Sequence, residues 1–350
     1  MTFVWFEDPA IREFVASCTG SADFVAGELV QSLWSGYGEI RRVNPGDGDA
    51  ATGASASVIA KWIDPPVQAA HPRGWSTPRS HQRKLTSYEV EKIWYRDFAK
   101  LCPVDAQVPS CLGHWQQKRQ QLLLLSDLDS NYPLRFESLG QYANTGIESC
   151  LKWLASFHAN FMGNTGEGLW PVGTYWYLAT RPDEYDVMED GPVKEAAEWL
   201  DKRLSDCPYQ TLVHGDAKVA NFCFSQRGEQ VAAVDFQYVG GGVGIRDVVY
   251  LLSSCLDEEV LFTESEHYLD TYFEHLHIAL ENSQTDSSAN HSAENVCKAW
   301  RELYAVAWTD FYRFLLGWMP DHPKTHRYTK EMSEQAIAEY KNSQRAGEKP

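Results

Sequence analysis

The stretch from residue 211 to residue 252 constrains the fold more than any other, because polar side chains twice follow short apolar runs in it. An apolar lead-in runs into His214-Gly215-Asp216, and Asn221 comes five residues after Asp216. A second apolar run, Val231 to Val234, ends on Asp235. We therefore expect two short strands that deliver two carboxylates and one amide to the same place.

Phosphoryl transfer from a nucleotide uses this set of side chains. One carboxylate orients or deprotonates the attacking hydroxyl, while an amide oxygen and a second carboxylate hold the metal ions that bridge the phosphates. Asp216 fits the first role, and Asn221 with Asp235 fits the second, because Mg²⁺ takes hard oxygen ligands and few protein groups. The gap from Asp216 to Asn221 matches the kinase catalytic loop H-R-D-x-x-x-x-N, with Gly215 in place of the arginine.

These motifs resemble those of the aminoglycoside phosphotransferase and choline kinase superfamily. Asp235-Phe236-Gln237, in place of Asp-Phe-Gly, is most similar to its ecdysteroid-kinase-like branch. The resemblance implies an α+β, bilobal protein-kinase-like fold, with a small β-rich N-lobe and a larger, mainly helical C-lobe. It implies a nucleotide-binding lobe over residues 1–125 and a catalytic and substrate-binding lobe over residues 126–350. Lys218 stands where Ser/Thr protein kinases carry a lysine near the transferring phosphate.

The N-terminal part predicts one or two short helices over residues 8–30, followed by two strand-like runs, 29–34 and 39–43. Gly36 and Gly38 lie between those runs, and glycines allow a hairpin backbone to approach phosphates closely. An ordinary turn is the alternative. We expect this hairpin to cover the nucleotide phosphates, because a kinase-like fold places such a hairpin first.

Val58-Ile59-Ala60-Lys61 resembles the V-A-I-K strand, whose lysine binds the α- and β-phosphates. The helical spacing over residues 87–98 places Glu91 on the inward face, and Glu91-x-x-Trp94-Tyr95 resembles the E-x-x-F-Y pattern of the same family, which implies that Glu91 holds Lys61. Glu89 is the competing candidate, and a surface residue that only supports the helix is the alternative. Residues 64–86, rich in proline and basic residues, predict either a flap near the substrates or a loop without a role.

The apolar run Leu122 to Leu125 predicts a buried strand that ends at the hinge between the lobes. Backbone groups from Leu125 to Asp127 would then contact the adenine edge. Farther on, His158 is interpreted as a structural residue on a helix, and residues 239–244 as a glycine-rich loop. Asp247 occupies the position of an acidic residue that braces the catalytic loop in the resembled family.

Composition limits the remaining classes. A chain of 350 residues favours two lobes, and its net charge of −17, from 48 acidic and 31 basic residues, argues against a nucleic-acid binder. The eight cysteines include no C-x-x-C pair, which disfavours a zinc site and a disulfide framework. No signal peptide or membrane-spanning run is recognised, so we expect a cytoplasmic protein without a membrane partner. The sequence does not indicate an oligomeric state.

We predict ATP- and Mg²⁺-dependent phosphorylation of a hydroxyl on a small-molecule alcohol. One alternative is a nucleotide-binding protein without catalysis, and another is a metal-dependent hydrolase that uses Asp216, His214 and Asp235. The acceptor stays open between aminoglycoside, choline and a sterol-like alcohol. Aromatic residues over 296–318 would either enclose a cationic acceptor or form core, and helical spacing favours core.

Overall fold

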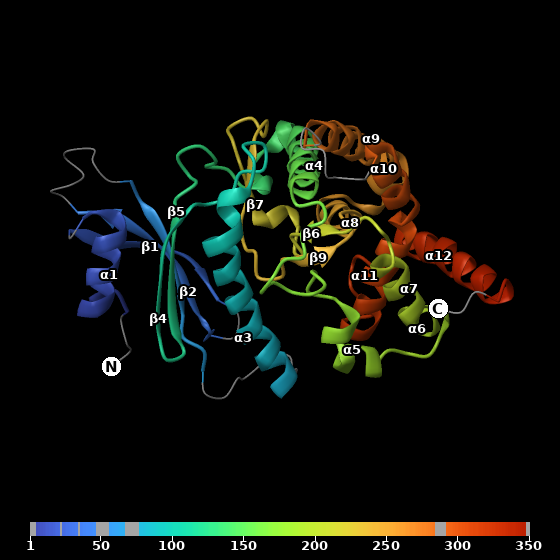
Figure 1. The fold of residues 1–350 in the computed structure, drawn as a ribbon, viewed down its shortest axis with the longest axis horizontal. Coiled ribbons are helices and arrows are strands. Elements are labelled where there is room, and N and C mark those ends of the chain that lie inside the picture. The colour runs from blue at the N-terminus through green and yellow to red at the C-terminus, as the bar shows by residue number, and fades with distance from the viewer. Residues whose placement is uncertain are drawn as a thin grey trace. The chain divides into compact units, whose positions relative to one another are not determined.

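The computed structural model describes residues 5–21, 23–33, 36–46, 56–66, 77–283 and 292–347. The chain forms two compact units. Unit 1 consists of Met1–Leu101 and Val108–Asn131, and unit 2 of Cys102–Gln107 and Tyr132–Pro350. Figure 1 follows the chain from the blue N-terminal elements to the red C-terminal helix. The assignment of nucleotide binding to residues 1–125 and of catalysis to residues 126–350 stays a prediction.

Unit 1 is built on an antiparallel five-stranded sheet in the order β1-β2-β3-β5-β4. Its strands are β1 (Phe24–Ser32), β2 (Gly38–Pro45), β3 (Val58–Ile63), β4 (Cys111–Gln117) and β5 (Gln120–Ser126). Its helical elements are η1 (Trp5–Glu7), α1 (Pro9–Thr19), α3 (Pro78–Ile93), η3 (Trp94–Phe98, a π-helical turn) and η4 (Ala99–Leu101).

The two faces of β3 explain how unit 1 positions a lysine. Successive strand residues point to opposite faces of a sheet. Val58, Ala60 and Trp62 pack in one core with residues of α1, while Ile63 packs with Tyr88 of α3 in another. Lys61 alternates with Ala60 and Trp62, so the strand directs it to the α3 face.

Two sequence expectations in unit 1 are wrong. The second short helix expected within residues 8–30 is strand β1, whose β-branched and aromatic residues favour extended backbone. The loop expected over residues 64–86 ends early, because α3 begins at Pro78 with Thr77 as its N-cap, and Thr77 Oγ1 accepts from Ser80 N at 3.1 Å. Residues 67–76 of the proposed flap lie outside the described residues.

Unit 2 is mainly helical (Figure 1). Its longer helices are α4 (Ala143–Asn160), α7 (Ala197–Ser205), α8 (Ile245–Cys255), α9 (Glu258–Ser283), α10 (Ala293–Glu302), α11 (Tyr304–Trp318) and α12 (Arg327–Arg345). Its short helical elements are η5 (Phe136–Ser138), η6 (Gly140–Tyr142), η7 (Leu178–Thr180), α5 (Pro182–Asp186), α6 (Pro192–Glu195) and η8 (Val219–Asn221). The single helix expected over residues 296–318 is broken at Leu303 into α10 and α11.

Two short antiparallel ladders carry the polar motifs of unit 2. One pairs β6 (Thr211–Val213) with β9 (Gly240–Gly242), and the other pairs β7 (Phe222–Phe224) with β8 (Val231–Ala233). The two strands expected around His214 and before Asp235 are therefore confirmed. The loop expected over residues 239–244 is wrong in part, because three of its four glycines, Gly240 to Gly242, form β9 and pair with β6.

The predicted α+β fold, with a smaller β-rich N-terminal part and a larger, mainly helical C-terminal part, is confirmed. Among the described residues, none of the helices has the length and apolarity needed to cross a bilayer.

Candidate active site

The loop after β6 is fixed by one buried carboxylate. Asp247, on the first turn of α8, accepts hydrogen bonds from the main-chain nitrogens of His214 at 2.6 Å and Gly215 at 3.0 Å. His158 Nε2 lies 3.1 Å from the same carboxylate. Both Asp247 and His158 are fully buried. The expected bracing role of Asp247 is confirmed, and the structural interpretation of His158 gains a partner that the sequence did not reveal.

Gly215 stands where the kinase loop has arginine, and the backbone explains the replacement. Its φ angle is +79°, which L side chains rarely adopt. A Cβ atom here would lie 2.0 Å from the main-chain oxygen of Tyr238. The turn that presents Asp216 therefore requires glycine.

Asp216 lies at the centre of a polar cluster within unit 2. Asn221 Nδ2 donates to its main-chain oxygen at 2.8 Å and to its Oδ2 at 3.1 Å. Lys218 Nζ donates to the same Oδ2 at 3.3 Å. Tyr250, on α8, lies near the Asp216 carboxylate, and after burial the charge of that carboxylate contributes most to raising the pKa of the phenol. The side chains of Asp216, Lys218 and Asn221, which the sequence grouped, thus meet directly.

The charges of the cluster shift one another's proton affinity. Burial raises the pKa of Asp216, the nearby Lys218 ammonium opposes this change, and the Asp235 charge adds to it. Burial lowers the pKa of Lys218, but Asp216 and Asp235 outweigh burial and leave it raised. A carboxylate with a raised pKa beside a lysine that stays protonated is suited to accept a proton from a hydroxyl group.

Asp235 follows β8 with a φ angle of +69°, a conformation uncommon for a residue other than glycine. The β7–β8 ladder continues one step beyond its strands, since Val234 N donates to Asn221 O at 2.9 Å. Gln237 Nε2 donates to Asp235 Oδ1 at 2.8 Å. Gln237 therefore helps to fix the Asp235 carboxylate, a contact that only the Asp-x-Gln spacing could have suggested.

Both ring nitrogens of His214 contact main-chain groups. Its Nδ1 accepts from Asp216 N at 3.2 Å, and its Nε2 lies 3.0 Å from Val234 O. The residue is fully buried. Since both ring nitrogens contact main-chain groups, His214 links the loop after β6 to the end of the β7–β8 hairpin and is poorly placed for proton transfer.

The oxygen donors of Asn221 and Asp235, which flank the β7–β8 hairpin, fit a magnesium ion shared with a nucleotide. Because Asn221 Nδ2 faces Asp216, its Oδ1 points to the other side of the amide. Across the described residues, no three His, Cys, Asp or Glu side chains gather closely enough to hold a metal by themselves. Mg²⁺ commonly takes only one or two protein carboxylates and completes its shell with phosphates and water.

In unit 1 the expected ion pair between β3 and α3 is present. Lys61 Nζ lies 2.7 Å from Glu91, and both side chains are almost fully buried. The competing candidate, Glu89, binds Lys92 and Gln121 instead. The geometry thus selects Glu91 as the partner of Lys61, while their role toward a nucleotide stays a prediction.

The expected glycine hairpin is also present, since β1 and β2 pair as antiparallel neighbours. Gly36 has a φ angle of +72°, and a Cβ there would meet nothing within 4 Å. Gly38 has a φ angle of +143°, and a Cβ there would lie 2.0 Å from Trp62 O. Between them, the buried Tyr37 hydroxyl is hydrogen-bonded to His81 of α3. Gly38 is therefore required by packing within the sheet, whatever its role toward phosphates.

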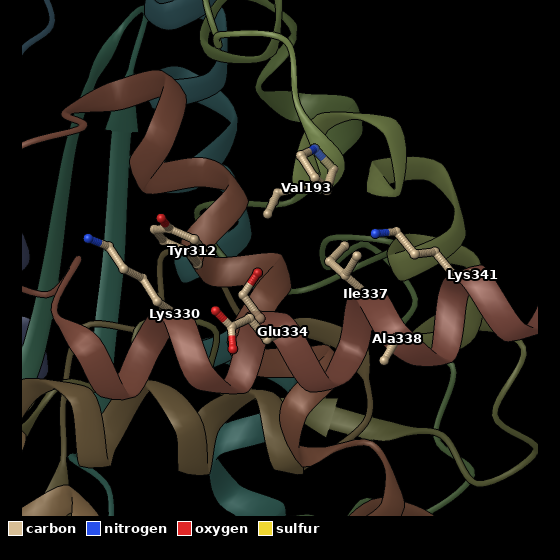
Figure 2. Close-up of a pocket in the computed structure, with 9 residues that line it drawn as sticks. Val193, Tyr312, Lys330, Glu334, Ile337, Ala338 and Lys341 are labelled. Atoms are coloured by element: carbon tan, nitrogen blue, oxygen red, sulfur yellow. The ribbon is translucent and has the colours of Figure 1, made fainter.

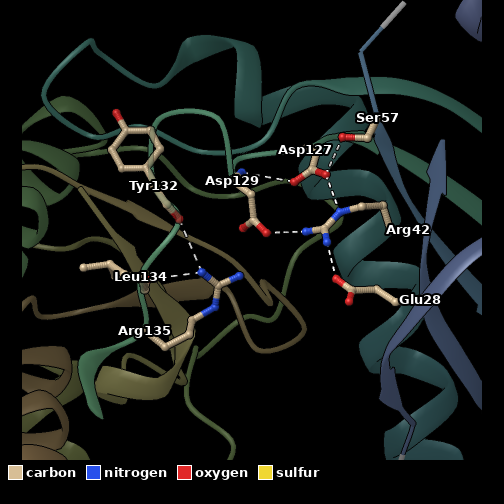
Figure 3. Close-up of polar contacts among 8 residues, drawn as sticks. All are labelled: Glu28, Arg42, Ser57, Asp127, Asp129, Tyr132, Leu134 and Arg135. Carbon is tan, nitrogen blue, oxygen red and sulfur yellow. Dashed lines mark hydrogen bonds and ion pairs between the residues drawn. The ribbon is translucent and has the colours of Figure 1, made fainter. Parts of the chain in front are cut away.

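At the end of β5 the side chain of Asp127 is occupied by unit 1 itself. Arg42 Nε donates to Asp127 Oδ2 at 2.6 Å, and Ser57 Oγ donates to the same atom at 2.7 Å (Figure 3). Arg42 also contacts Glu28 and Asp129 (Figure 3). Because these contacts engage the Asp127 side chain, only the backbone of Leu125 to Asp127 is left to contact adenine in the predicted site. These are the groups that the sequence analysis proposed.

Sequence reasoning missed an aromatic wall beside Asp216. Tyr250 packs on Trp176, Tyr175 and Phe311, with ring centroids 5.0, 5.4 and 5.2 Å apart. Burial raises the pKa of both the Tyr175 and the Tyr250 phenol, and the charge of Asp216 adds to the change in each. Aromatic spacing in α11 signalled core, but the chain between β6 and α8 gave no sign of which rings reach Asp216.

A separate groove of about 420 Å³ lies among α6, α11 and α12. Figure 2 shows Val193, Tyr312 and Ile337 along it, with Lys330, Glu334 and Lys341 on α12. None of the site residues predicted from the sequence lines this groove. We assign it no role in the chemistry of Asp216.

The comparison with protein families bears on the same segment. Residues 186–285 match the model of the ecdysteroid kinase-like family. The predicted resemblance is confirmed. The match includes the β6–β9 and β7–β8 ladders, and with them Asp216, Asn221, Asp235 and the bracing Asp247. No curated protein matches the sequence.

Several solved structures are similar at low sequence identity. A microcompartment-associated aminopropanol kinase is 13% identical, with 95% of this chain and 94% of that chain covered and a TM-score of 0.44. A choline/ethanolamine kinase family protein from Mesorhizobium loti is 14% identical, with 97% and 91% covered and a TM-score of 0.45. The GDP complex of a mutant aminoglycoside 2′-phosphotransferase is 12% identical, with 90% and 93% covered and a TM-score of 0.46.

Proposed function

We propose that the protein transfers the γ-phosphoryl group of ATP to a hydroxyl of a small-molecule alcohol. The observation that carries the proposal is the buried Asp216 carboxylate, with Lys218 and Asn221 on one oxygen. The family match over residues 186–285 supports it. A small molecule is the favoured acceptor, because Asp247 follows Asp235 by only twelve residues and leaves no room for a long activation loop.

In this proposal Asp216 orients the acceptor hydroxyl and takes its proton as the oxygen attacks phosphorus. The raised pKa of Asp216 makes the carboxylate a better base than an exposed aspartate. Lys218 offsets negative charge on the transferring group and keeps the carboxylate ionised until the hydroxyl arrives. Asp247 and His158 hold the loop so that Asp216 needs no rearrangement.

Asn221 Oδ1 and the Asp235 carboxylate are the groups that would hold Mg²⁺. The ion, when bound with the nucleotide, neutralises charge on the phosphates. In unit 1, Lys61 held by Glu91 would bind the phosphates, and the hairpin with Gly36 and Gly38 would cover them. The backbone from Leu125 to Asp127 would contact the adenine.

The two alternatives fit the geometry less well. A catalytically silent nucleotide-binding protein has no need of Asp216, Asn221, Asp235 and Lys61 together. A metal-dependent hydrolase would need His214 as an acid or base, but both of its ring nitrogens bond the backbone.

The eight cysteines are all free thiols, which supports our proposal of a reducing, cytoplasmic compartment.

The test is a panel of hydroxylated metabolites incubated with Mg²⁺ and γ-labelled ATP. We expect label in at least one alcohol with the wild type and none above background with Asp216→Ala. ADP formation by the wild type but not by Asp216→Ala, without a labelled alcohol, would favour a hydrolase. A thermal shift with Mg–ATP but no ADP formation with any alcohol would favour the silent nucleotide-binding protein.

A further inference from the structure

Lys324 lies in the segment between α11 and α12, and its backbone is held on both sides. Its amide donates to His322 Nδ1 at 3.1 Å, and its carbonyl accepts from Thr329 Oγ1 at 2.7 Å. Trp308 Nε1 in turn donates to Thr329 Oγ1 at 2.9 Å. The direction in which the Lys324 side chain leaves the backbone is therefore fixed by neighbouring helices.

The ammonium group of Lys324 lies on the aromatic wall beside Asp216. Its Nζ is 4.8 Å from the ring centroid of Tyr250 and 5.4 Å from that of Phe311. It also donates to Ser253 Oγ at 3.3 Å. Tyr250 belongs to the wall that borders the Asp216 loop, since Tyr175, whose ring centroid is 5.4 Å from that of Tyr250, donates its main-chain nitrogen to Gly215 O at 3.2 Å. Lys324 thus stands one side chain away from the group that would receive the acceptor hydroxyl.

No carboxylate of the described residues lies within 4.0 Å of Lys324 Nζ, in contrast to Lys218, which is 3.3 Å from Asp216. Burial lowers the pKa of Lys324 to about 8, although the charge of Asp216 acts in the opposite direction. At neutral pH the group is still mainly protonated. Two positive side chains, Lys218 and Lys324, therefore lie in the surroundings of a single buried aspartate.

Aromatic faces attract cations, and a quaternary ammonium ligand uses such faces for binding. Here the faces of Tyr250 and Phe311 already contact the ammonium group of Lys324. A second positive charge brought to the same rings would be repelled across a partly buried site, where screening by water is weak.

We propose that Lys324 is a specificity-determining residue that excludes positively charged acceptors, so that the enzyme takes an alcohol without a positive charge. The inference rests on the proposed function, since it names the class of that acceptor. It disfavours the aminoglycoside and choline classes left open by the sequence. It also argues against an aromatic enclosure for a cationic acceptor, because the cation at Phe311 is Lys324.

The experiment measures binding rather than phosphoryl transfer, so its outcome is separate from that of the activity test. Choline is titrated into the nucleotide-free protein in a calorimeter, and 3,3-dimethylbutan-1-ol serves as the uncharged probe of the same shape. The proteins are the wild type, Lys324→Met, Lys324→Arg and Lys330→Met. Lys330→Met removes an equal charge from an exposed position on α12 and is the matched control. Thermal unfolding verifies that each variant is folded.

We expect the wild type to bind the uncharged alcohol more tightly than choline. Lys324→Met should bind choline about tenfold more tightly than the wild type does, because the ammonium of choline then lies on the rings and no lysine repels it. Affinity for the uncharged alcohol should change less than about twofold, since its interaction with the rings involves no charge. Lys324→Arg and Lys330→Met should retain the wild-type preference. The proposal is overturned if the wild type binds choline as tightly as the uncharged alcohol, or if choline fails to bind Lys324→Met more tightly.

Discussion

Lys61 in unit 1 and Lys324 in unit 2 are both lysines in aromatic surroundings, but their charges are balanced differently. Lys61 Nζ lies 2.7 Å from Glu91, and the two side chains are only 4% and 2% exposed. Lys324 has aromatic faces and a hydroxyl as its neighbours, while the charge of Asp216 reaches it only from a greater distance. One charge is neutralised at contact and the other is not.

The difference indicates which of the two lysines can discriminate between charged and uncharged ligands. A buried ion pair holds its members in one geometry, because separating them would leave a charge without compensation. Such a pair can present a lysine to a ligand without selecting among ligands of similar shape. An ammonium group without a carboxylate in contact affects which ligands bind beside it, because any charged ligand interacts with it directly. Substitutions in the two units test this contrast, from the largest expected effect to the smallest.

The largest effect is expected in unit 2, at Asp216. Asp216→Ala removes the proposed base, so turnover with the best acceptor should fall by about 10³-fold, as is typical for general-base catalysis. The affinity for Mg–ATP, measured by calorimetry, should change little. Asp206→Ala, on the exposed end of α7, is the control variant and should keep wild-type turnover. Turnover of Asp216→Ala within about tenfold of the wild type would refute the role of this carboxylate.

The next effect is expected in unit 1. Glu91→Gln leaves Lys61 charged and buried, so the free energy of unfolding should fall by about 3–5 kcal/mol. Lys61→Met combined with Glu91→Gln should recover part of this loss, because no charge then remains to be solvated. Urea unfolding of the two single variants and the double variant measures the coupling. Additive losses would show that the pair is weaker than its burial suggests.

A smaller effect is expected at the hairpin of unit 1. Gly38→Ala places a Cβ 2.0 Å from Trp62 O, so we expect a loss of about 3 kcal/mol in the free energy of unfolding. Gly36→Ala is the matched control: its φ is also positive, but a Cβ there meets nothing within 4 Å, and about 1 kcal/mol is expected. Equal losses in urea unfolding would mean that backbone conformation alone, and not the close approach to Trp62, requires Gly38.

The contrast also explains what the sequence could and could not predict. Lys61, Glu91, Asp216 and Asn221 are predictable because local patterns mark them: a strand before the lysine, a helix face for its partner, and a fixed spacing in the loop. Their pairing was expected from the resemblance to kinase motifs, and the contacts are present in the structure. Lys324 lies more than a hundred residues after Asp216, in a segment of proline and histidine with no periodicity.

Other misses have the same cause. Helical spacing predicts core for Phe311, and the ring is indeed buried, but spacing within one helix cannot say which cation the ring meets. In the sequence Gln237 is only a departure from glycine, although its side chain binds Asp235. The residues of β1 do not alternate regularly between buried and exposed positions. Its sequence therefore lacks the apolar–polar alternation by which a strand is recognised. Contacts set by tertiary packing do not appear in local patterns.

The smallest effect concerns the pH dependence of stability, and it tests the charge of Lys324 directly. Burial lowers the pKa of Lys324 to about 8 in the folded protein, from 10.5, against the opposing charges of Asp216 and Cys255 and with a small contribution from Lys218. Below about pH 8 both the folded and unfolded states hold the proton, so the penalty for burying the charge is constant. Above that pH the folded state loses its proton first, and the unfolded state binds more protons. Stability must therefore rise with pH in this range for the wild type relative to Lys324→Met.

We expect the stability of the wild type to rise by about 1 kcal/mol relative to that of Lys324→Met between about pH 7.5 and about pH 9.5, as measured by urea unfolding. Other titrating groups are common to both proteins and cancel in the difference. Lys330→Met is again the control for loss of a lysine from an exposed position. A difference that stays constant with pH would mean that the aromatic faces and Ser253 compensate the Lys324 charge as fully as Glu91 compensates Lys61. The two lysines would then be equivalent, and the exclusion of cationic acceptors would lose its physical basis.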